Sequence, residues 1–445
     1  MIIGAGPGGY ETAVEAAKAG LEVTIISDGP VGGTCLNEGC IPTKTLCHSA
    51  ELIEAAKSAA QYGVQVNFEG LDLSKALSRK DEVVGQLRSG VEFLLKGKGI
   101  SLVYGKASFK DAHTVVVDSQ EIEADYVIIA TGSSSACLPI PGKEYTVTST
   151  QMLSPESVPQ RLCIIGAGVI GLEFASIYNS FGSEVTVLEF CKEILPRFDV
   201  DLAKRLKQSL SKKGISIETS ACVQSVSKTG SGYEVTYLKK EKESVVEADM
   251  VLMAVGRRPN VSSVNLDDIG VEYTPKGIKV GSDMRTSVPH IFAIGDVTGG
   301  IMLAHAATFQ GKVALDAILA EAGLPCEARH IDLSIIPAAV FTSPEAAMVG
   351  LTEEDCEAGG LAVRCLKSRY QSNGKAVSMG QTDGFCKMII SQEDGRILGC
   401  HIFGAHSADL VQELSALMAM GATLEDFRGM VHAHPTLSEV LQSIS

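Results

Sequence analysis

One structural unit occurs twice in this sequence, and it constrains the fold more than any other feature. The two copies read "MIIGAGPGGYETAVEAAKAGLEVTIIS", residues 1–27, and "LCIIGAGVIGLEFASIYNSFGSEVTVLE", residues 162–189. Each copy is a short apolar strand, a G-x-G-x-x-G turn, an Ala-rich helix that ends near a glycine, and a strand rich in β-branched residues. A strand, helix and strand in this order form a βαβ unit, so we expect an α/β fold that contains this unit twice.

The two glycine-rich turns are typical of sites that bind the pyrophosphate of a dinucleotide. Glycines allow the backbone to approach the phosphates, and the N-terminus of the following helix offers free N–H groups with a partial positive charge. One such motif is weak evidence, but two copies that both lie between a strand and a helix are strong evidence. Two dinucleotide sites imply two nucleotides, or one cofactor that passes electrons to another. The candidate residues are Gly4, Gly6, Pro7, Gly8 and Gly9 in the first turn, and Gly166, Gly168, Val169, Ile170 and Gly171 in the second.

The residue at the end of the second strand helps to distinguish the nucleotides. Glu189 lies 23 positions after Gly166, where a carboxylate accepts a hydrogen bond from a ribose 2′-OH and repels a 2′-phosphate. The second site should therefore prefer NAD to NADP, although a solvated glutamate at a strand end is the alternative. In the first copy the same offset gives Ser27, followed by Asp28. Either Asp28 reaches the ribose or Ser27 makes a weaker bond, and the first strand is also short, with only residues 1–3 before the glycine.

Composition excludes several classes of function. The net charge of −15 over 445 residues argues against binding to a nucleic-acid backbone. No apolar run approaches the ~18 residues of a membrane span, and no signal peptide is visible, so we expect a cytoplasmic protein. Twelve cysteines are scattered through the chain and should be free thiols in a reducing compartment. Cys35 and Cys40 in "GGTCLNEGCIPTK" are the exception: they read as a metal clip, a structural bridge or a redox pair. Zinc would need two further ligands at matching spacing, and the second pair is missing.

Several further motifs resemble one family. In addition to "GGTCLNEGCIPTK", the chain contains "IIATGS" (128–133), "AVGRRPN" (254–260), "TSVPHIFAIGDV" (286–297), "MLAHAATFQG" (302–311), "IPAAVFTSPEAAMVGLTEE" (336–354) and "VHAHPTLSEV" (431–440). Along its whole length the chain resembles the flavoprotein disulfide reductases, and among them most closely the dihydrolipoamide dehydrogenases. "CLN" and "CIP" favour the lipoamide branch over glutathione reductase, and Glu38 stands where a small apolar residue is usual.

The resemblance implies the domain organisation. It predicts two Rossmann-like nucleotide-binding domains followed by a C-terminal α+β dimerisation domain. The FAD-binding domain should comprise residues 1–148 and 261–330, the NAD-binding domain residues 149–260, and the dimerisation domain residues 331–445. It also implies a homodimer in which each active site takes its histidine and glutamate from the partner subunit.

The resemblance also implies roles for individual residues. Cys35 and Cys40 would form a redox-active disulfide beside the flavin, with Lys44 one helical turn further on and paired with Glu173. His434 would be the catalytic base, oriented by Glu439, whereas His432 is a weaker candidate. The other expected FAD-binding residues are Ser27, Asp28, Gly33, Thr34, Thr131, Gly132, Gly295, Asp296, Met302, Leu303, Ala304 and His305, and Gly256 joins Glu189 in the NAD site. No metal ligands are expected.

The implied reaction is the oxidation of dihydrolipoamide by NAD+ through the disulfide and FAD. The substrate would be carried on a lipoyl domain of a 2-oxoacid dehydrogenase or glycine cleavage complex. Glutathione, coenzyme A disulfide and mercuric reductases are the alternatives within the family. However, the mercuric branch carries a C-terminal cysteine pair where this chain ends "LQSIS", and a glutathione site would favour basic residues where Glu38 stands. A flavin-binding or structural protein without catalysis is the alternative from another class, and it is supported only by Ser27 and the short first strand.

Overall fold

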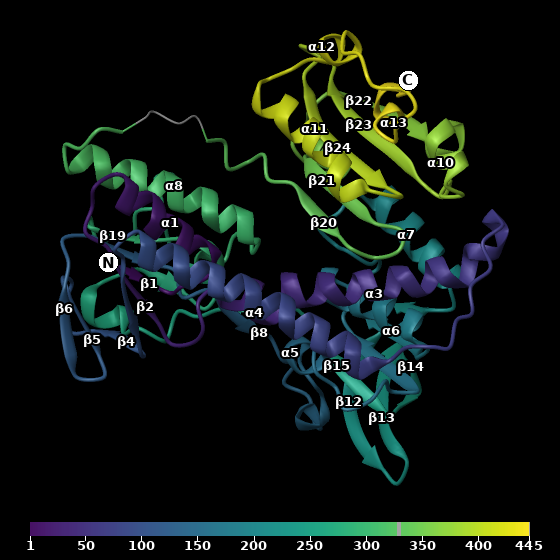
Figure 1. Ribbon diagram of the computed structural model, residues 1–445, viewed down its shortest axis with the longest axis horizontal. Helices are drawn as coiled ribbons and strands as arrows, with labels where there is room; N and C mark the ends of the chain where they lie inside the picture. The colour runs from purple at the N-terminus through teal and green to yellow at the C-terminus, as the bar shows by residue number, and fades with distance from the viewer. Residues whose placement is uncertain (327–330, 445) are drawn as a thin grey trace. The chain divides into compact units, whose positions relative to one another are not determined.

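The protein is described by a computed structural model that covers residues 1–326 and 331–444 (Figure 1). Its residues form two compact units. The first contains Met1–Thr45, Ser74–Ala136 and Gly256–Leu333, and the second contains Leu46–Leu73, Cys137–Val255 and Ser334–Ser445. The division into three domains at residues 148, 260 and 330 stays a prediction, and residue 330 lies outside the described residues.

A parallel sheet forms the centre of the first unit. Its strand order is β19 (Ile291–Ala293), β7 (Val127–Ile129), β1 (Ile2–Ile3), β2 (Thr24–Ser27) and β3 (Ser101–Tyr104), and all four pairings are parallel. Alternate residues on these strands enter two different apolar clusters, since Ile2 and Ile25 belong to one cluster and Ile3 and Ile26 to the other. The sheet is therefore buried on both faces, as parallel sheets generally are. Helices α1 (Pro7–Lys18) and α8 (Ala304–Glu321) run side by side against it (Figure 1).

The second unit contains two larger sheets. One is parallel, in the order β11 (Ser216–Thr219), β10 (Glu184–Glu189), β9 (Arg161–Ile165) and β15 (Met250–Met253), with α6 (Val169–Phe181) between β9 and β10. The other is antiparallel, in the order β20 (Ala338–Val340), β21 (Ala346–Gly350), β24 (Ile397–Phe403), β23 (Phe385–Ser391) and β22 (Val363–Arg369), with α11 (Ser407–Ala419) packed on it. Together with the sheet of the first unit, they confirm the α/β fold with a C-terminal α+β part.

The remaining elements are short helices, hairpins and the two long helices of the N-terminal half. The helices are α2 (Gly33–Glu38), α3 (Cys40–Ser58), η1 (Ala59–Tyr62), α4 (Leu73–Gly97), η2 (Lys143–Tyr145), α5 (Ser149–Met152), α7 (Val200–Lys212), η3 (Leu266–Ile269), η4 (Gly295–Thr298), α9 (Glu353–Ala358), η5 (Tyr370–Ser372), α10 (Gly374–Ser378), α12 (Leu424–Arg428) and α13 (Glu439–Gln442). The strands are β4 (Ala107–Phe109), β5 (Thr114–Val117), β6 (Gln120–Glu123), β8 (Ser133–Ser135), β12 (Cys222–Thr229), β13 (Gly232–Lys239), β14 (Lys242–Ala248), β16 (Arg257–Pro259), β17 (Tyr273–Thr274) and β18 (Gly277–Ile278).

The two βαβ copies agree in their hydrogen bonding. The N–H of Gly4 donates to the carbonyl of Ile26 at 2.8 Å, and the N–H of Gly166 donates to the carbonyl of Leu188 at 2.8 Å. A Cβ added to Gly9 would lie 1.9 Å from the Gly4 carbonyl oxygen, and one added to Gly171 would lie 2.0 Å from that of Gly166. Only glycine fits the last position of either turn, so the repeat predicted from the sequence is confirmed.

One predicted helix begins earlier than expected. The sequence indicates a helix from residue 44 to residue 63, but α3 begins at Cys40 and ends at Ser58, followed by the 3₁₀ turn η1. Pro42 does not prevent the earlier start, because backbone N–H groups in the first turn of a helix have no acceptor within the helix.

An ion cluster around a buried lysine links three elements of the second unit, α7, α9 and β23. The side chain of Lys387 on β23 is fully buried and contacts Asp199, Asp201 and Glu353 at 2.8, 3.0 and 2.5 Å. Asp199 also caps α7 by accepting from the N–H of Asp201. The cluster therefore ties the start of α7 to the C-terminal sheet.

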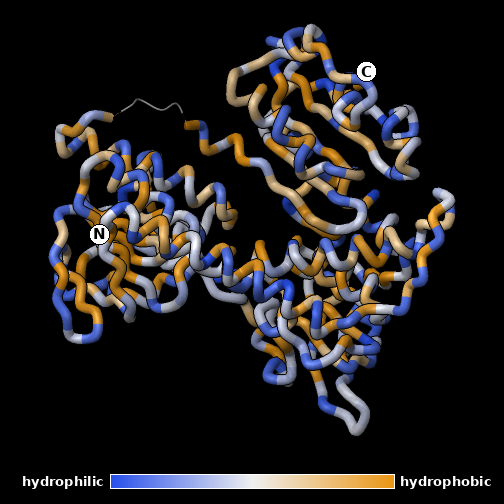
Figure 2. The backbone as a smooth tube through the Cα atoms, in the orientation of Figure 1, coloured by the Kyte–Doolittle hydropathy of each residue, from blue (hydrophilic) through white to orange (hydrophobic). Residues whose placement is uncertain are grey.

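Apolar and polar residues are interleaved along the described part of the backbone (Figure 2). Within residues 1–326 and 331–444, no helix is both long and apolar enough to cross a membrane.

Candidate functional site

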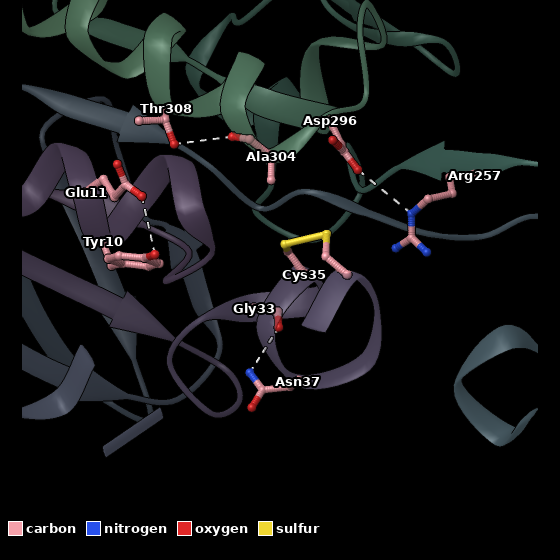
Figure 3. The surroundings of a disulfide bond; sticks show 10 residues. Tyr10, Glu11, Gly33, Cys35, Asn37, Arg257, Asp296, Ala304 and Thr308 are labelled. Carbon is pink, nitrogen blue, oxygen red and sulfur yellow. Dashed lines mark hydrogen bonds and ion pairs between the residues drawn. A yellow bond between two sulfur atoms is a disulfide. The ribbon is translucent and has the colours of Figure 1, made fainter. Parts of the chain in front are cut away.

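The structure joins Cys35 and Cys40 in a disulfide, with a Cα–Cα separation of 4.7 Å (Figure 3). Cys35 lies in the first turn of α2, and Cys40 is the first residue of α3. Gly39 separates the two helices, and a Cβ there would lie 3.0 Å from the Thr34 carbonyl oxygen. Because a disulfide leaves neither sulfur as a thiolate, this arrangement does not support the zinc interpretation. On reduction, the N-terminus of the 19-residue helix α3 would favour a thiolate at Cys40.

Asn37 forms hydrogen bonds at both ends of its amide that hold the helix carrying Cys35. Its Nδ2 donates to the carbonyls of Val31 and Gly33 at 3.0 and 2.9 Å, and its Oδ1 accepts from Arg88 Nε at 2.8 Å. Sequence reasoning used "CLN" only to choose a branch of the family and gave Asn37 no role. These contacts fix the geometry of α2 around the disulfide.

The expected FAD residues of the first unit gather at one edge of its sheet. The glycine turn follows β1, Ser27 ends β2, Thr131 and Gly132 follow β7, and Gly295 and Asp296 follow β19. All these strands are parallel, so their carboxyl ends meet at the edge where α/β sheets bind ligands. Gly33 and Thr34 begin α2, Met302 and Leu303 precede α8, and Ala304 and His305 begin it. Figure 3 shows Asp296 and Ala304 on one side of the disulfide.

Asp296 belongs to a polar group that sequence reasoning identified only in part. Its Oδ2 accepts from Ser133 Oγ at 2.5 Å and lies 3.8 Å from Arg257 Nε. Arg257 in turn donates to the hydroxyl and the carbonyl of Ser133 at 2.7 and 2.6 Å. Burial lowers the pKa of the Arg257 guanidinium, and the negative charges of Asp296 and Glu38 partly oppose this shift. The motifs "GRRPN" and "IIATGS" contain Arg257 and Ser133, so the sequence indicated these two segments but not the roles of the two residues.

The geometry of both turns fits a pyrophosphate. A Cβ on Gly168 would meet no protein atom within 4 Å, and one on Gly6 would meet only the Cα of Gly33, at 4.0 Å. Each of these glycines is the N-cap of its helix and makes no side-chain cap, so the first helical N–H groups remain available to an anion. The residues present therefore fit FAD at the first turn and NAD at the second.

The second strand of each βαβ copy, β2 or β10, ends in a residue of different charge. Glu189 is 7% exposed, and its two carboxylate oxygens accept from the N–H groups of Ala167 and Cys191 at 2.6 and 2.7 Å. Ser27 is 6% exposed and donates to the carbonyl of Gly29 at 2.8 Å. Asp28, the other candidate, is exposed.

Lys44 and Glu173 lie in different units, so each is described separately. Glu173 on α6 is 3% exposed and accepts from the N–H of Phe341 at 3.0 Å. Lys44 lies on α3, one turn after Cys40. Their pairing stays a prediction. Gly256, expected in the NAD site, follows β15 by three residues and is grouped with the first unit.

His434 and Glu439 form a hydrogen-bonded pair in the second unit. His434 Nδ1 lies 2.9 Å from Glu439 Oε1, and the other oxygen of Glu439 accepts from the N–H of Thr436 at 2.8 Å. The Thr436 N–H lowers the pKa of the Glu439 carboxyl most strongly, and His434 lowers it further. The His434 side chain is 78% exposed, which leaves its Nε2 edge open to a substrate or a second chain. The arrangement is that of a base held by a carboxylate.

His432 has a different partner from His434. Its Nε2 lies 2.7 Å from Glu413 Oε1 on α11, and its ring packs edge-on against Phe427 with centroids 5.6 Å apart. The side chain is buried. His432 therefore anchors the segment that carries His434 to α11 and does not share Glu439.

Comparisons with known proteins agree over the full length of the chain. Residues 1–311 match the family described as pyridine nucleotide-disulphide oxidoreductase, and residues 336–444 match the dimerisation domain of that family. The dihydrolipoyl dehydrogenase of Geobacillus stearothermophilus is 41% identical over 99% of this chain and 94% of its own length. The mitochondrial dihydrolipoyl dehydrogenase of Pisum sativum is 37% identical over 99% of this chain and 89% of its own.

A solved structure gives the same result. The Cu(II) complex of the HOCl-induced flavoprotein disulfide reductase RclA from Escherichia coli has a TM-score of 0.87 and 31% sequence identity. The match covers 100% of this chain and 98% of that one. With its repeated nucleotide turns, its Cys35–Cys40 disulfide and its C-terminal sheet, the chain therefore belongs to the pyridine nucleotide-disulphide oxidoreductase family.

Proposed function

We propose that the protein is a dihydrolipoyl dehydrogenase that oxidises dihydrolipoamide with NAD+. The disulfide at the start of α3, beside a sheet edge suited to FAD, is the observation that carries this function. Relatives with this activity in their name match the whole chain at about 40% identity. Enzymes of this type use FAD and NAD, and both glycine turns of this chain fit such cofactors.

The first chemical step is thiol–disulfide exchange at Cys35. Glu439 holds His434 through Nδ1, so that Nε2 can take the proton of a substrate thiol. The resulting thiolate attacks Cys35 Sγ, the Cys35–Cys40 bond breaks, and Cys40 leaves as a thiolate at the N-terminus of α3. The second substrate thiol then attacks the substrate sulfur of the mixed disulfide, which releases Cys35 and the oxidised cyclic disulfide. The enzyme is left with a dithiol at Cys35 and Cys40.

Other residues of this chain bind and orient the cofactors. When bound, FAD would supply the electron acceptor for the Cys35–Cys40 dithiol, and NAD+ would supply the final hydride acceptor. Asp296, held by Ser133 and Arg257, would bind the ribityl chain, and the first glycine turn would bind the pyrophosphate of FAD. Glu189 would accept hydrogen bonds from the adenosine ribose of NAD. Lys44 and Glu173 would place a charge pair beside the reacting centre.

The assembly follows from the same proposal. The C-terminal segment matches a dimerisation domain, which supports a homodimer. We propose that His434 and Glu439 of one subunit serve the disulfide of the other, and that the FAD, NAD and dimerisation domains comprise 1–148 with 261–330, 149–260, and 331–445. The physiological substrate would be dihydrolipoamide on a lipoyl carrier domain in the cytoplasm.

A substrate comparison tests the function. Purified protein should catalyse NADH-dependent reduction of lipoamide much faster than reduction of glutathione disulfide or coenzyme A disulfide. Cys35→Ser should abolish lipoamide turnover while FAD remains bound. Cys137→Ser is the matched control, because Cys137 is an exposed cysteine outside the Cys35–Cys40 disulfide, and this variant should keep full activity. Faster turnover of glutathione disulfide, or activity in the Cys35→Ser variant, would reject the proposal.

A further inference from the structure

The two βαβ copies allow one nucleotide site to be compared with the other, residue by residue. Strand pairing aligns Ile3 with Ile26 in the first copy and Ile165 with Leu188 in the second. The residue after each partner is Ser27 in one copy and Glu189 in the other. The positions of Ser27 and Glu189 are therefore equivalent in the fold as well as in sequence offset.

The surroundings of these two residues are also equivalent. The carbonyl of Ala5 accepts from the N–H of Gly32 at 2.7 Å, and the carbonyl of Ala167, its counterpart, accepts from the N–H of Leu195 at 3.0 Å. The N–H of Ala167 donates to Glu189, whereas the described part of the chain provides no acceptor for the N–H of Ala5. Ala5 is buried, so its N–H is a donor at the sheet edge that is left for a ligand.

Asp28 does not replace the missing carboxylate. It follows the last residue of β2 and lies in the bend after the strand, so it does not occupy the position that is equivalent to Glu189. It is exposed, as is Phe190 at the equivalent place in the second copy. Ser27 is buried, and because its hydroxyl proton goes to the Gly29 carbonyl, its oxygen lone pairs remain able to accept.

We propose that Ser27, and not Asp28, faces the adenosine ribose of FAD, and that the Ser27 oxygen and the Ala5 N–H form an uncharged ribose site in place of a carboxylate. The inference rests on the proposed use of FAD. A serine side chain is shorter than a glutamate side chain and carries no charge. This site therefore makes fewer charge-assisted hydrogen bonds to FAD than the Glu189 site can make to NAD, and FAD is held more weakly than a carboxylate would hold it.

Affinity measurements on the full-length chain stripped of FAD test the inference. FAD is titrated back while its fluorescence is followed, for the wild type and for Ser27→Glu, Ser27→Ala and Asp28→Asn. Ser27→Glu should lower the Kd at least tenfold, because each hydrogen bond to a charged group corresponds to a factor of about 10 to 100. Ser27→Ala should raise the Kd about two- to fivefold, and Asp28→Asn should change it by less than about twofold.

A second ligand separates the ribose contact from general effects on folding. FAD with a 2′-deoxyadenosine should bind the wild type about two- to fivefold more weakly than FAD itself, because only one uncharged contact is lost. The Ser27→Glu variant should lose at least tenfold on the same change. The inference would be overturned if Asp28→Asn weakened FAD binding more than Ser27→Ala does. It would also be overturned if the wild type bound the deoxy analogue tenfold more weakly than FAD. These two comparisons do not need Ser27→Glu to fold, which circular dichroism would establish.

The result is distinguishable from a failure of the proposed function. If the function is wrong, the chain will not bind FAD or will bind it without turning over lipoamide. If only this inference is wrong, lipoamide turnover will be normal and the affinity losses will map to Asp28.

Discussion

Replacement of Glu189 by glutamine should weaken binding of NADH and permit binding of NADPH. The carboxylate is buried and holds two backbone N–H groups at 2.6 and 2.7 Å, so its position is fixed before a ligand arrives. Glutamine retains one acceptor oxygen, but its amide group then faces a backbone donor. A hydrogen bond to a charged acceptor contributes about 1.5–3 kcal/mol and a neutral one about 0.5–1.5 kcal/mol. The difference for one ribose hydroxyl is about 1–1.5 kcal/mol, or about five- to tenfold in Kd.

The effect on NADPH has the opposite sign. A carboxylate and a phosphate charge about 4 Å apart repel by up to about 4 kcal/mol at an effective dielectric constant of 20. Removing the charge should therefore raise kcat/KM for NADPH at least tenfold. The assay is lipoamide reduction with each nucleotide, combined with calorimetric Kd values. Glu184→Gln is the matched control, because Glu184 begins the same strand and is exposed. An NADH affinity within twofold of wild type, with NADPH still rejected, would refute the role of Glu189.

Three further predictions concern other parts of the chain. Gly168→Ala should leave the melting temperature unchanged, because the added Cβ would meet no protein atom within 4 Å. The same methyl group should fill the space for the phosphates and weaken NADH binding at least tenfold, and an unchanged Kd would exclude this role of the turn. Lys387→Met should cost about 3–5 kcal/mol in denaturant unfolding by leaving Asp199 buried without a cation, and the double variant with Asp199→Asn should recover part of it. A loss below about 1 kcal/mol in Lys387→Met would contradict the structural role of the cluster. The Glu439 carboxyl should titrate with a midpoint below pH 4.5 in a ¹³C NMR experiment, because the folded state lowers its pKa. Its contribution to stability is then complete above pH 4.5 and is lost as the pH falls through the folded pKa. A midpoint at or above pH 4.5 would contradict the Thr436 and His434 contacts.

The sequence predicted those features that depend on local spacing. The βαβ repeat follows from the glycine turns and their flanking strands, and the family motifs point to Cys35 with Cys40 and to His434 with Glu439. Each of these pairs lies within six residues, so a short motif contains both partners. The start of α3 was displaced by four residues, because Pro42 suggests a helix boundary although it is compatible with a first turn.

The features that were missed depend on contacts between distant segments. Arg257 meets Ser133 across 124 residues, and Asn37 meets Arg88 across 51. A motif can point to each residue separately, but neither periodicity nor a local motif specifies that the two segments meet. A count from the first glycine gives Ser27, and the strand register agrees with it, but the burial of Ser27 and the exposure of Asp28 could be seen only in the fold. For the same reason the burial of Lys387 among three carboxylates was not anticipated.

Thiol labelling tests the central claim most directly. The holoenzyme is treated anaerobically with one equivalent of NADH, alkylated, and mapped by mass spectrometry. Cys35 and Cys40 should resist alkylation before NADH is added and should both be alkylated afterwards, with no such change in the protein stripped of FAD. If both residues stay unlabelled after the flavin is reduced, or if the gain in labelling falls on other cysteines, the Cys35–Cys40 disulfide is not the electron acceptor of this enzyme.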